Sequence, residues 1–252
     1  MSGIAVRELT ADDAAWAAGL MEQRRQVYAR YSPVFWRPAQ DVTGLHERFL
    51  RRQIASPANV ALRTEHGFII GQRRGQEGFV DDFAVDEAGS WDGDGAGLLL
   101  ATWHRWQTAG GADAVRVVTA HADEEKSGML GRLSLELAEQ WWVREVQPAG
   151  QARPAGEARP AGQARPAGQV GGAGFSGLLG PAPPVYDPGG PVLHVDDLDD
   201  DADLTAVERE SAMMGAVLLV VPAVPGSARA ERLSRPGWSV ASDWYLGRPA
   251  AT

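Results

Sequence analysis

Residues 117–143 read VVTAHADEEKSGMLGRLSLELAEQWWV, and the landmarks of this stretch return later in the chain. Val220-Val221 lies 103 residues after Val117-Val118, and Trp244-Tyr245 lies 103 residues after Trp141-Trp142. Each copy has the pattern of a buried strand, a polar helix and an alternating strand that ends in paired aromatic residues. Internal similarity of this kind indicates a structural unit that occurs more than once. We therefore predict a duplicated α/β unit, present as a tandem repeat.

The composition limits the classes of protein and partner. The 252 residues have a net charge of −9, no cysteine, 44% hydrophobic and 23% charged residues, as in a globular protein. No basic stripe with interleaved aromatic residues occurs, so we expect no nucleic-acid partner. The absence of cysteine excludes disulfides and cysteine nucleophiles and suits a reducing compartment.

Targeting and membrane signals are also absent from this sequence. The first residues, MSGIAVRELTADD, have neither the basic nor the apolar region of a signal peptide. No apolar run approaches the ~20 residues that a membrane-spanning helix needs. We expect a cytoplasmic protein without a membrane partner.

A low-complexity segment divides the chain. Ala-Arg-Pro-Ala-Gly starts at Ala152, Ala158 and Ala164, and a segment of this kind has almost nothing to bury. We predict a first domain over residues 1–146, a linker over 147–173 and a second domain over 174–252. The second copy is truncated, because the first strand and the two opening helices of the first domain have no counterpart after the linker.

Hydrophobic periodicity and turn residues predict the elements. Before the linker we expect strands over 4–9, 59–64, 67–72, 78–85, 115–119 and 135–146, and helices over 11–31, 42–55, 98–107 and 124–132. After the linker we expect strands over 192–198, 216–221 and 238–246, and helices over 204–214 and 227–233.

A glycine-rich stretch, Asp92-Gly93-Asp94-Gly95-Ala96-Gly97-Leu98, joins a predicted strand to a predicted helix. Glycines at alternate positions let backbone N–H groups at a helix N-terminus converge on an anion such as a phosphate. The stretch is neither a Walker loop, because no Gly-Lys-Ser/Thr follows, nor a dinucleotide fingerprint, because Leu98 stands where a glycine is needed. A flexible turn that enters a helix is the alternative interpretation.

The order of these elements, with Phe83-Ala84-Val85 followed by Asp92-x-x-Gly95-Ala96-Gly97, resembles the GCN5-related N-acetyltransferase (GNAT) superfamily. The resemblance covers residues 4–146, and a partial second copy covers about 174–249. It implies an α/β fold with a mixed, mostly antiparallel sheet flanked by helices and a partial internal duplication.

The same resemblance implies the position of the acyl donor. The pyrophosphate of an acyl-CoA, acetyl-CoA or another, would lie on the backbone amides of Gly93, Asp94, Gly95, Ala96, Gly97 and Leu98. The pantetheine arm would follow the strand ending at Ala84 and Val85, where that strand diverges from the strand 115–119.

Three departures from the family pattern bear on activity. Asp92 stands where the family has arginine or glutamine, and Leu130 stands where many members have the tyrosine that protonates the leaving thiolate. The second copy has Asp199-Asp200-Asp201-Ala202-Asp203 in place of a glycine loop, so we expect no CoA there.

Acetylation of an amine needs a base that removes a proton from the ammonium group. Asp81 and Asp82 lie on the strand that would face the acyl group, and strict alternation would let only one of them enter the site. We favour Asp82, which shares a face with Ala84, while a solvated or capping role remains the alternative. His121, directly after a buried strand, is a third catalytic candidate.

Four aromatic residues, Tyr28, Tyr31, Phe35 and Trp36, lie on the first long helix and the turn after it. In the family this region forms a wall of the acceptor site, whereas packing of the helix against the sheet is the alternative. The five histidines show no spacing typical of metal ligands, so we expect no metal.

We predict an N-acetyltransferase that moves an acetyl or other acyl group from acyl-CoA to an amine of a small molecule, as a monomer or homodimer. One alternative is a catalytically degenerate GNAT pair that acts as a binding or regulatory module. Another is aminoacyl transfer from tRNA, which the negative net charge disfavours.

Overall fold

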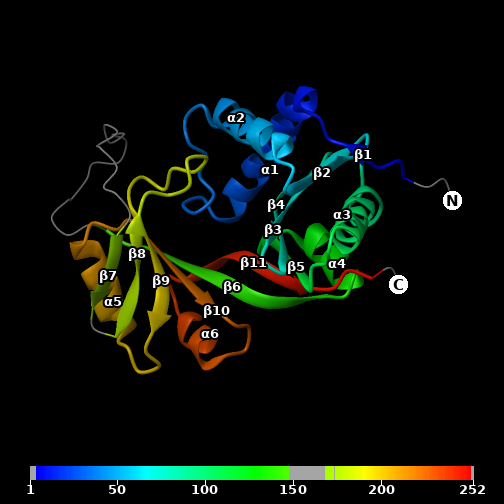
Figure 1. The fold of residues 1–252 in the computed structure, drawn as a ribbon. Helices are drawn as coiled ribbons and strands as arrows, with labels where there is room; N and C mark the ends of the chain where they lie inside the picture. The colour runs from blue at the N-terminus through cyan, green and yellow to red at the C-terminus, as the bar shows by residue number, and fades with distance from the viewer. Residues whose placement is uncertain (1–3, 148–167, 173, 251–252) are drawn as a thin grey trace. The chain divides into compact units, whose positions relative to one another are not determined.

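The computed structural model describes residues 4–147, 168–172 and 174–250. Figure 1 shows its helices and strands, which are, in chain order, β1 (Arg7–Glu8), the 3-10 turn η1 (Ala11–Asp13), α1 (Ala14–Tyr31), α2 (Val42–Ala55), β2 (Asn59–Arg63), β3 (Gly67–Arg74), β4 (Glu77–Val85), the π-helical turn η2 (Trp91–Gly95), α3 (Ala96–Thr108), β5 (Ala114–Ala120), α4 (Glu124–Arg132), β6 (Leu135–Glu145), β7 (Gly168–Gly172), β8 (Phe175–Gly180), β9 (Val192–Leu198), α5 (Leu204–Met213), β10 (Leu218–Ala223), α6 (Ala228–Leu233) and β11 (Ser239–Gly247).

The chain divides into two compact units, each built from separate segments. Unit 1 contains Met1–Tyr28, Asp41–Ala138 and Asp243–Thr252, and unit 2 contains Ala29–Gln40 and Glu139–Ser242. The boundaries fall inside α1, β6 and β11. The predicted domains 1–146 and 174–252 were continuous in sequence, whereas each compact unit includes residues from both halves of the chain.

The sheet of unit 1 has the strand order β1-β2-β3-β4-β5 followed by β11. Neighbours from β1 to β4 pair antiparallel, and β4 pairs with β5 in parallel. The parallel pair requires a crossover connection, which α3 supplies. The predicted α/β fold, with a mixed, mostly antiparallel sheet flanked by helices, is confirmed.

Helices cover both faces of this sheet (Figure 1). Small residues of α1 and Leu50 of α2 pack against Phe68 and Ile70 of β3, and all of them are almost fully buried. On the opposite face Leu98 and Leu99 of α3 pack with residues of α4 and with Val80. The small alanine side chains of α1 allow this helix to pack closely against β3.

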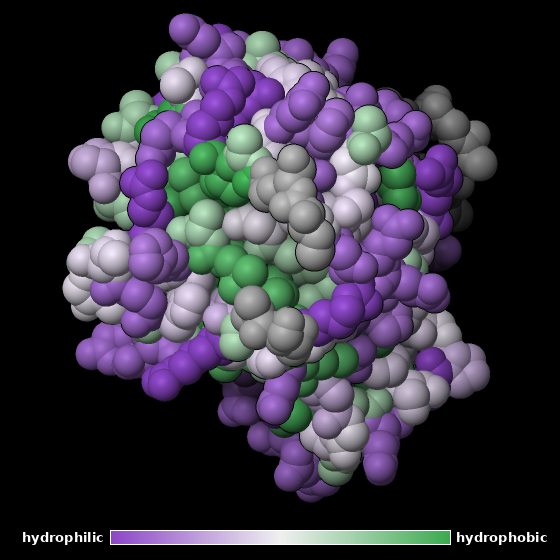
Figure 2. All heavy atoms as spheres, turned by 90° about the vertical axis from the view of Figure 1, so that its right-hand side faces the viewer, coloured by the Kyte–Doolittle hydropathy of each residue, from purple (hydrophilic) through white to green (hydrophobic). Residues whose placement is uncertain are grey.

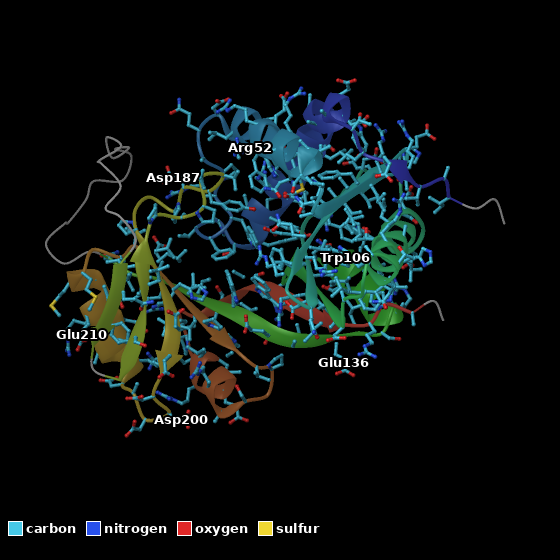
Figure 3. The ribbon with its side chains drawn as sticks, in the orientation of Figure 1. Arg52, Trp106, Glu136, Asp187, Asp200 and Glu210 are labelled. Carbon is cyan, nitrogen blue, oxygen red and sulfur yellow. The ribbon has the colours of Figure 1, made fainter. Side chains whose placement is uncertain are left out.

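Trp106 of α3 shows why two strand glycines are needed. A Cβ atom at either Gly71 or Gly78 would overlap its indole ring, so the ring lies directly on the bare backbone of β3 and β4. Figure 3 shows Trp106 among the side chains between α3 and the strands. The indole is 3% exposed and belongs to the main core of unit 1.

The surface on the side of α3 is polar with apolar interruptions. Figure 2 shows hydrophobic groups between charged ones on this face. Leu100 and Trp103 of α3 are only partly buried, consistent with this pattern. Among the described helices, none combines the length and the apolar character that crossing a bilayer requires.

Unit 2 repeats most of this architecture. Its elements β7-β8-β9-α5-β10-α6-β11 follow the same order of strands and helices as β2-β3-β4-α3-β5-α4-β6. β9 and β10 pair in parallel, as β4 and β5 do. Within the described ranges, β1, α1 and α2 have no counterpart after the linker, so the predicted truncated duplication agrees with the structure.

A β-bulge recurs at the same place in both units. In unit 1 the register shifts between Ile69 and Gly71, where Asp81 and Asp82 of β4 oppose a single residue of β3. In unit 2 it shifts between Ser176 and Gly177, at the equivalent Val-Asp-Asp segment of β9. The prediction that only one of Asp81 and Asp82 can enter the site rested on strict alternation, which the bulge interrupts.

The predicted linker 147–173 is wrong at its C-terminal end. Residues 168–172 form β7, which pairs antiparallel with β8. Backbone hydrogen bonds to β8 and the packing of Val170 against the core of unit 2 hold this strand, so the glycine-rich sequence that predicted a linker does not prevent pairing. Residues 148–167 and 173 of the predicted linker lie outside the described residues.

Candidate active site

The parallel strands β4 and β5 of unit 1 pair over only part of their length. The pairs run from Glu77 opposite Ala114 to Val80 opposite Val117, although β4 continues to Val85 and β5 to Ala120. Backbone groups on the facing edges beyond Val80 and Val117 are therefore not used in this ladder. The strand divergence that the family resemblance implied is present.

The glycine-rich stretch is not an open loop. It forms the π-helical turn η2, which runs directly into α3. The N–H of Gly93 donates to the Ser90 side chain at 2.9 Å, and the N–H of Gly95 donates to the Ser90 carbonyl at 3.2 Å. The N–H of Ala96 donates to the carbonyl of Trp91. The prediction of open amides is therefore wrong for Gly93, Gly95 and Ala96, because helical hydrogen bonds and the Ser90 cap already use them.

Carboxylates lie at this helix N-terminus. Asp94 is buried and accepts a hydrogen bond from the N–H of Ser90 at 3.2 Å. Asp92, at the position of the family's arginine or glutamine, pairs with Arg132 of α4, whose Nε lies 2.9 Å from its Oδ1. Acids are stabilised at this end of a helix, so they compete with an anionic ligand for the same place.

The other predicted cofactor-binding residues are placed as follows. Gly97 has room for a Cβ atom, which would lie 3.9 Å from Ile4 and Val6. Leu98 is fully buried in the core. Ala84 and Val85 pair with β3 on one edge, and their other edge lies beyond the last β4–β5 pair.

Asp82 lies in a buried row of polar side chains. His46 of α2 contacts Asp82 through Nε2, 2.7 Å from Oδ1, and its Nδ1 faces the Arg25 guanidinium. With Arg25 donating to Nδ1, His46 donates from Nε2 to the carboxylate. Burial raises the pKa of Asp82 to about 6, although the charges of Arg25 and Lys126 oppose this shift.

Asp81 differs from its neighbour in its access to water. It is exposed on β4. Partial desolvation, together with the charge of Asp82, raises the pKa of Asp81 to about 6. Of the two predicted carboxylates, the structure places Asp82 in a buried network and Asp81 where solvent reaches it.

His121 follows β5 and has a partner from the far end of the chain. Its Nδ1 lies 3.0 Å from both carboxylate oxygens of Asp243, which β11 contributes to unit 1. The imidazole is half-exposed, whereas Asp243 is buried. The hydrogen bond and charge of Asp243 outweigh burial and raise the pKa of His121. Val80 and Val117 form the last pair of β4 and β5. His121 lies four residues after Val117, and Ala84 lies four residues after Val80, so both follow the point where the two strands diverge.

Lys126 of α4 is a buried cation that sequence analysis missed. Its Nζ donates to the Val118 carbonyl at 2.8 Å and lies 5.1 and 5.4 Å from the ring centres of Phe83 and Trp91. Burial lowers the pKa of Lys126, although nearby Tyr28 opposes this effect. A signal was present, since Lys126 is the only lysine in the chain.

Tyr28 belongs to this network rather than to an acceptor wall. Its hydroxyl donates to Asp123 at 2.9 Å, and Arg24 pairs with the same carboxylate. Burial raises the pKa of Tyr28, but the charges of Lys126 and Arg24 outweigh it and leave the pKa below its usual value. The phenol is 7% exposed.

The four predicted wall residues are divided between the two compact units. Tyr28 belongs to unit 1, whereas Tyr31, Phe35 and Trp36 belong to unit 2. Trp36 is buried, donates from Nε1 to the Ala241 carbonyl at 3.0 Å and packs against Phe35. The packing interpretation holds for Tyr28 and Trp36, because both are buried and hydrogen-bonded within the protein; Tyr31 is 45% exposed.

Two further residues of the network gave no sequence signal. His46 lies on an amphipathic helix, where a histidine is unremarkable, and Asp243 is separated from His121 by 122 residues. Within the part of the chain that the structure describes, no group of three His, Asp or Glu side chains has an arrangement that would hold a metal ion.

Comparison with solved structures identifies the fold. A proposed acetyltransferase from Thermoplasma acidophilum matches with a TM-score of 0.61 at 13% identity, over 97% of this chain and 100% of that one. A proposed acetyltransferase from Pyrococcus horikoshii matches with a TM-score of 0.55 at 10% identity, over 100% and 91%. A GCN5-related N-acetyltransferase from Sphaerobacter thermophilus matches with a TM-score of 0.52 at 12% identity, over 99% and 98%.

The chain therefore has the fold of the GCN5-related N-acetyltransferases. No protein-family model matches the sequence, and no curated protein matches it either.

Proposed function

We propose that this protein transfers an acyl group from an acyl-CoA, in the first instance acetyl-CoA, to an amine of a small molecule, and that unit 1 carries the reaction. The observation that supports this most is the divergence of β4 and β5 beyond Val80 and Val117. Free backbone groups along a strand edge bind an extended chain as an added strand would, which suits the amide-containing pantetheine arm. The solved structures that share this fold include acetyltransferases, which supports the proposal.

The titratable groups near this divergence suit proton transfer. His121 and Asp243 form a pair in which a buried carboxylate orients a half-exposed imidazole. In the proposed reaction His121 accepts the proton that the amine loses as it attacks the thioester, and Asp243 positions His121. Asp81, which is exposed to solvent, is a second candidate proton acceptor. Positioning of the two reactants supplies the remaining rate enhancement.

One specific observation favours a different role. The amides of Gly93, Gly95 and Ala96 are already used, and Asp94 lies at the helix N-terminus where a pyrophosphate would bind. A chain that no longer binds CoA, and serves as a binding or regulatory module, would retain the fold with this arrangement. The two functions differ in their affinity for acetyl-CoA.

The test is a thermal-shift titration with acetyl-CoA followed by assay of thiol release. We expect acetyl-CoA to raise the melting temperature in a concentration-dependent way. We also expect thiol release in the presence of small amines. No stabilisation at millimolar acetyl-CoA would contradict the transferase and favour the module.

Substitution of the proposed base makes the test specific. His121→Ala removes the imidazole, so we expect kcat to fall by about 10²–10⁴-fold with little change in the affinity for acetyl-CoA. His104→Ala is the matched control, because His104 is exposed on α3. Equal activity of the two variants would show that His121 is not the base.

A further inference from the structure

The sequence contains one lysine, Lys126, and 23 arginines. Lys126 is buried, with 1% of its surface exposed. A buried lysine shifts its pKa readily and gives up its proton, whereas arginine stays protonated in proteins. Of the 24 lysine and arginine side chains, the one that can give up its proton therefore lies inside unit 1.

Its position coincides with the divergence of β4 and β5. The Val118 carbonyl that accepts from Nζ at 2.8 Å belongs to the first residue of β5 after the last pair with β4. An ammonium group has three hydrogens, and this bond uses one. Phe83 and Trp91 enclose the group, with ring centres 5.1 and 5.4 Å from Nζ.

Charged groups surround Lys126 from two elements besides its own. Asp81 and Asp82 on β4 and Tyr28 on α1 stabilise its protonated form, while Arg24 on α1 destabilises it. Burial is the largest influence, and the net result is a pKa below the usual value for lysine. A pKa nearer to that of a thiol makes the ammonium a better proton donor to sulfur.

The repeat has an arginine near the corresponding point. Arg229 of α6 lies 103 residues after Lys126, the offset of the duplicated strands, but it is the second residue after the N-cap Ser227, whereas Lys126 is the third after the N-cap Asp123. Its guanidinium donates to the Leu198 carbonyl of β9 at 3.0 Å and to the Pro222 carbonyl of β10 at 3.5 Å. In unit 2 this cation thus connects β9 and β10, whereas in unit 1 the hydrogen bond of Lys126 goes to β5.

Resting on the proposed acyl transfer, we propose that Lys126 is the catalytic residue that donates a proton to the departing sulfur. The amine nitrogen adds to the thioester carbonyl, the C–S bond then breaks with its electron pair on sulfur, and a proton passes from Nζ to sulfur. The ammonium substrate loses two protons, one before the attack and one to His121 during it, and both reach solvent. Lys126 is left neutral and regains one proton from solvent. An ammonium substrate and a thioester thus give an amide, a thiol and one proton.

The residue of α4 at the position of the family's proton donor cannot fill this role. Leu130, at the position of the family's tyrosine, is fully buried and apolar, so it has no proton to give. It lies one helical turn after Lys126, on the same face of α4. If Lys126 has taken over the proton transfer, this explains both the replacement of the family's tyrosine by Leu130 and the presence of a lysine one turn earlier.

The experiment uses acetyl-CoA with hydroxylamine, a small nucleophile that is largely unprotonated at neutral pH, so that the rate depends on departure of the thiol. We expect the rate of thiol release by the wild type to fall at alkaline pH as Lys126 loses its proton. Lys126→Met should lower that rate by about 10²–10⁴-fold and retain the thermal shift with acetyl-CoA. Glu125→Met, an exposed change on the same helix, should leave the rate unchanged.

Lys126→Arg separates proton transfer from a structural role. The variant keeps the positive charge, but arginine stays protonated in proteins and cannot donate the proton. If Lys126 donates the proton, the arginine variant is as slow as Lys126→Met. A wild-type rate in Lys126→Arg would overturn the proposal, and this decides the question even if Lys126→Met does not fold.

The single lysine also allows a direct measurement. Isotope-labelled lysine gives one set of side-chain NMR signals, and the proposal requires their titration to coincide with the alkaline loss of activity. Disagreement of the two pKa values would overturn it. If the wild type neither binds acetyl-CoA nor releases thiol, the proposed function fails together with this inference, whereas an active wild type with an equally active Lys126→Arg fails only the inference.

Discussion

At the scale of single residues, unit 1 buries several ionisable side chains beside its apolar core. Arg25, His46 and Asp82 form one buried row, and Tyr28 with Asp123 forms another around Lys126. Burial of such groups costs free energy unless each is paired. Proteins retain arrangements of this kind where proton transfer or binding depends on them.

The raised pKa of Asp82 predicts how stability depends on pH. A carboxyl whose pKa is about 6 in the folded state and near 3.8 when unfolded binds its proton more tightly in the folded state. Its contribution to stability is therefore full below about pH 4 and is lost as the pH rises to about 6. We expect the free energy of unfolding of the wild type to fall over this range.

Asp82→Asn removes the titration and keeps an oxygen that accepts from His46. We expect it to reduce the loss of stability between pH 4 and 6 by about 1–2 kcal/mol, measured by urea unfolding at a series of pH values. Asp12→Asn, an exposed acid in the first turn before α1, is the control. A variant with the same pH slope as the wild type would show that Asp82 titrates normally.

The pairing of His121 with Asp243 predicts a shift of the opposite kind. Asp243 raises the pKa of His121, so it adds stability that is full below the unfolded pKa of about 6.5 and is lost as the pH rises through the folded value. Asp243→Asn should lower the pKa of His121 in an NMR titration and destabilise the fold more at pH 6 than at pH 9. An unchanged histidine titration would contradict the contact.

At the scale of elements, the packing of Trp91 in the turn η2 depends on Gly95. A Cβ atom at Gly95 would lie 2.7 Å from the Trp91 ring, while at Gly97 it would meet only Ile4 and Val6 at 3.9 Å. Gly95→Ala should therefore destabilise the protein by about 1–3 kcal/mol, and Gly97→Ala should be neutral or slightly stabilising. Chemical denaturation of both variants tests this, and equal stabilities would contradict the close contact at Trp91.

Most elements were predictable because their patterns are local. Helix α4 and strand β9 have the bounds that were predicted, since capping residues and apolar periodicity mark them directly. The bulge at Asp81 and Asp82 was not predictable, because it depends on the register with β3. Nor was the helical form of Trp91–Gly95, because alternate glycines suit both an open loop and a helix start.

The candidate site was less predictable than the fold. His121, Asp81 and Asp82 could be proposed from their strands, but Asp243 approaches His121 only through the pairing of distant strands. The aromatic residues after Tyr28 were grouped with it from their proximity in sequence, which does not show that the compact units divide within α1.

At the scale of the whole molecule, each compact unit needs residues from both halves of the sequence. Unit 1 includes Asp243–Thr252, and unit 2 includes Glu139–Ser242 and Ala29–Gln40. A fragment of residues 1–146 alone would therefore lack the β11 segment and the partner of His121. We expect it to be unfolded or aggregated, as judged by circular dichroism and size-exclusion chromatography.

Co-expression of residues 1–146 with residues 168–252 should restore a soluble complex, because the missing segments are then present. A truncated control that removes only residues 248–252 should remain folded, since β11 ends at Gly247. A stable, monomeric 1–146 fragment would show that the β11 segment is dispensable.

The position of β11 also has a consequence during synthesis. Translation delivers residues 243–247 only after the 104 residues from 139 to 242 have followed the earlier segments of unit 1, which wait meanwhile with the neighbouring edge of β5 uncovered. Nascent chains in that state are vulnerable to association through their unpaired strand. Slow decoding of residues 139–242 should therefore lower the yield of native protein, and chaperones that shield such edges should restore it.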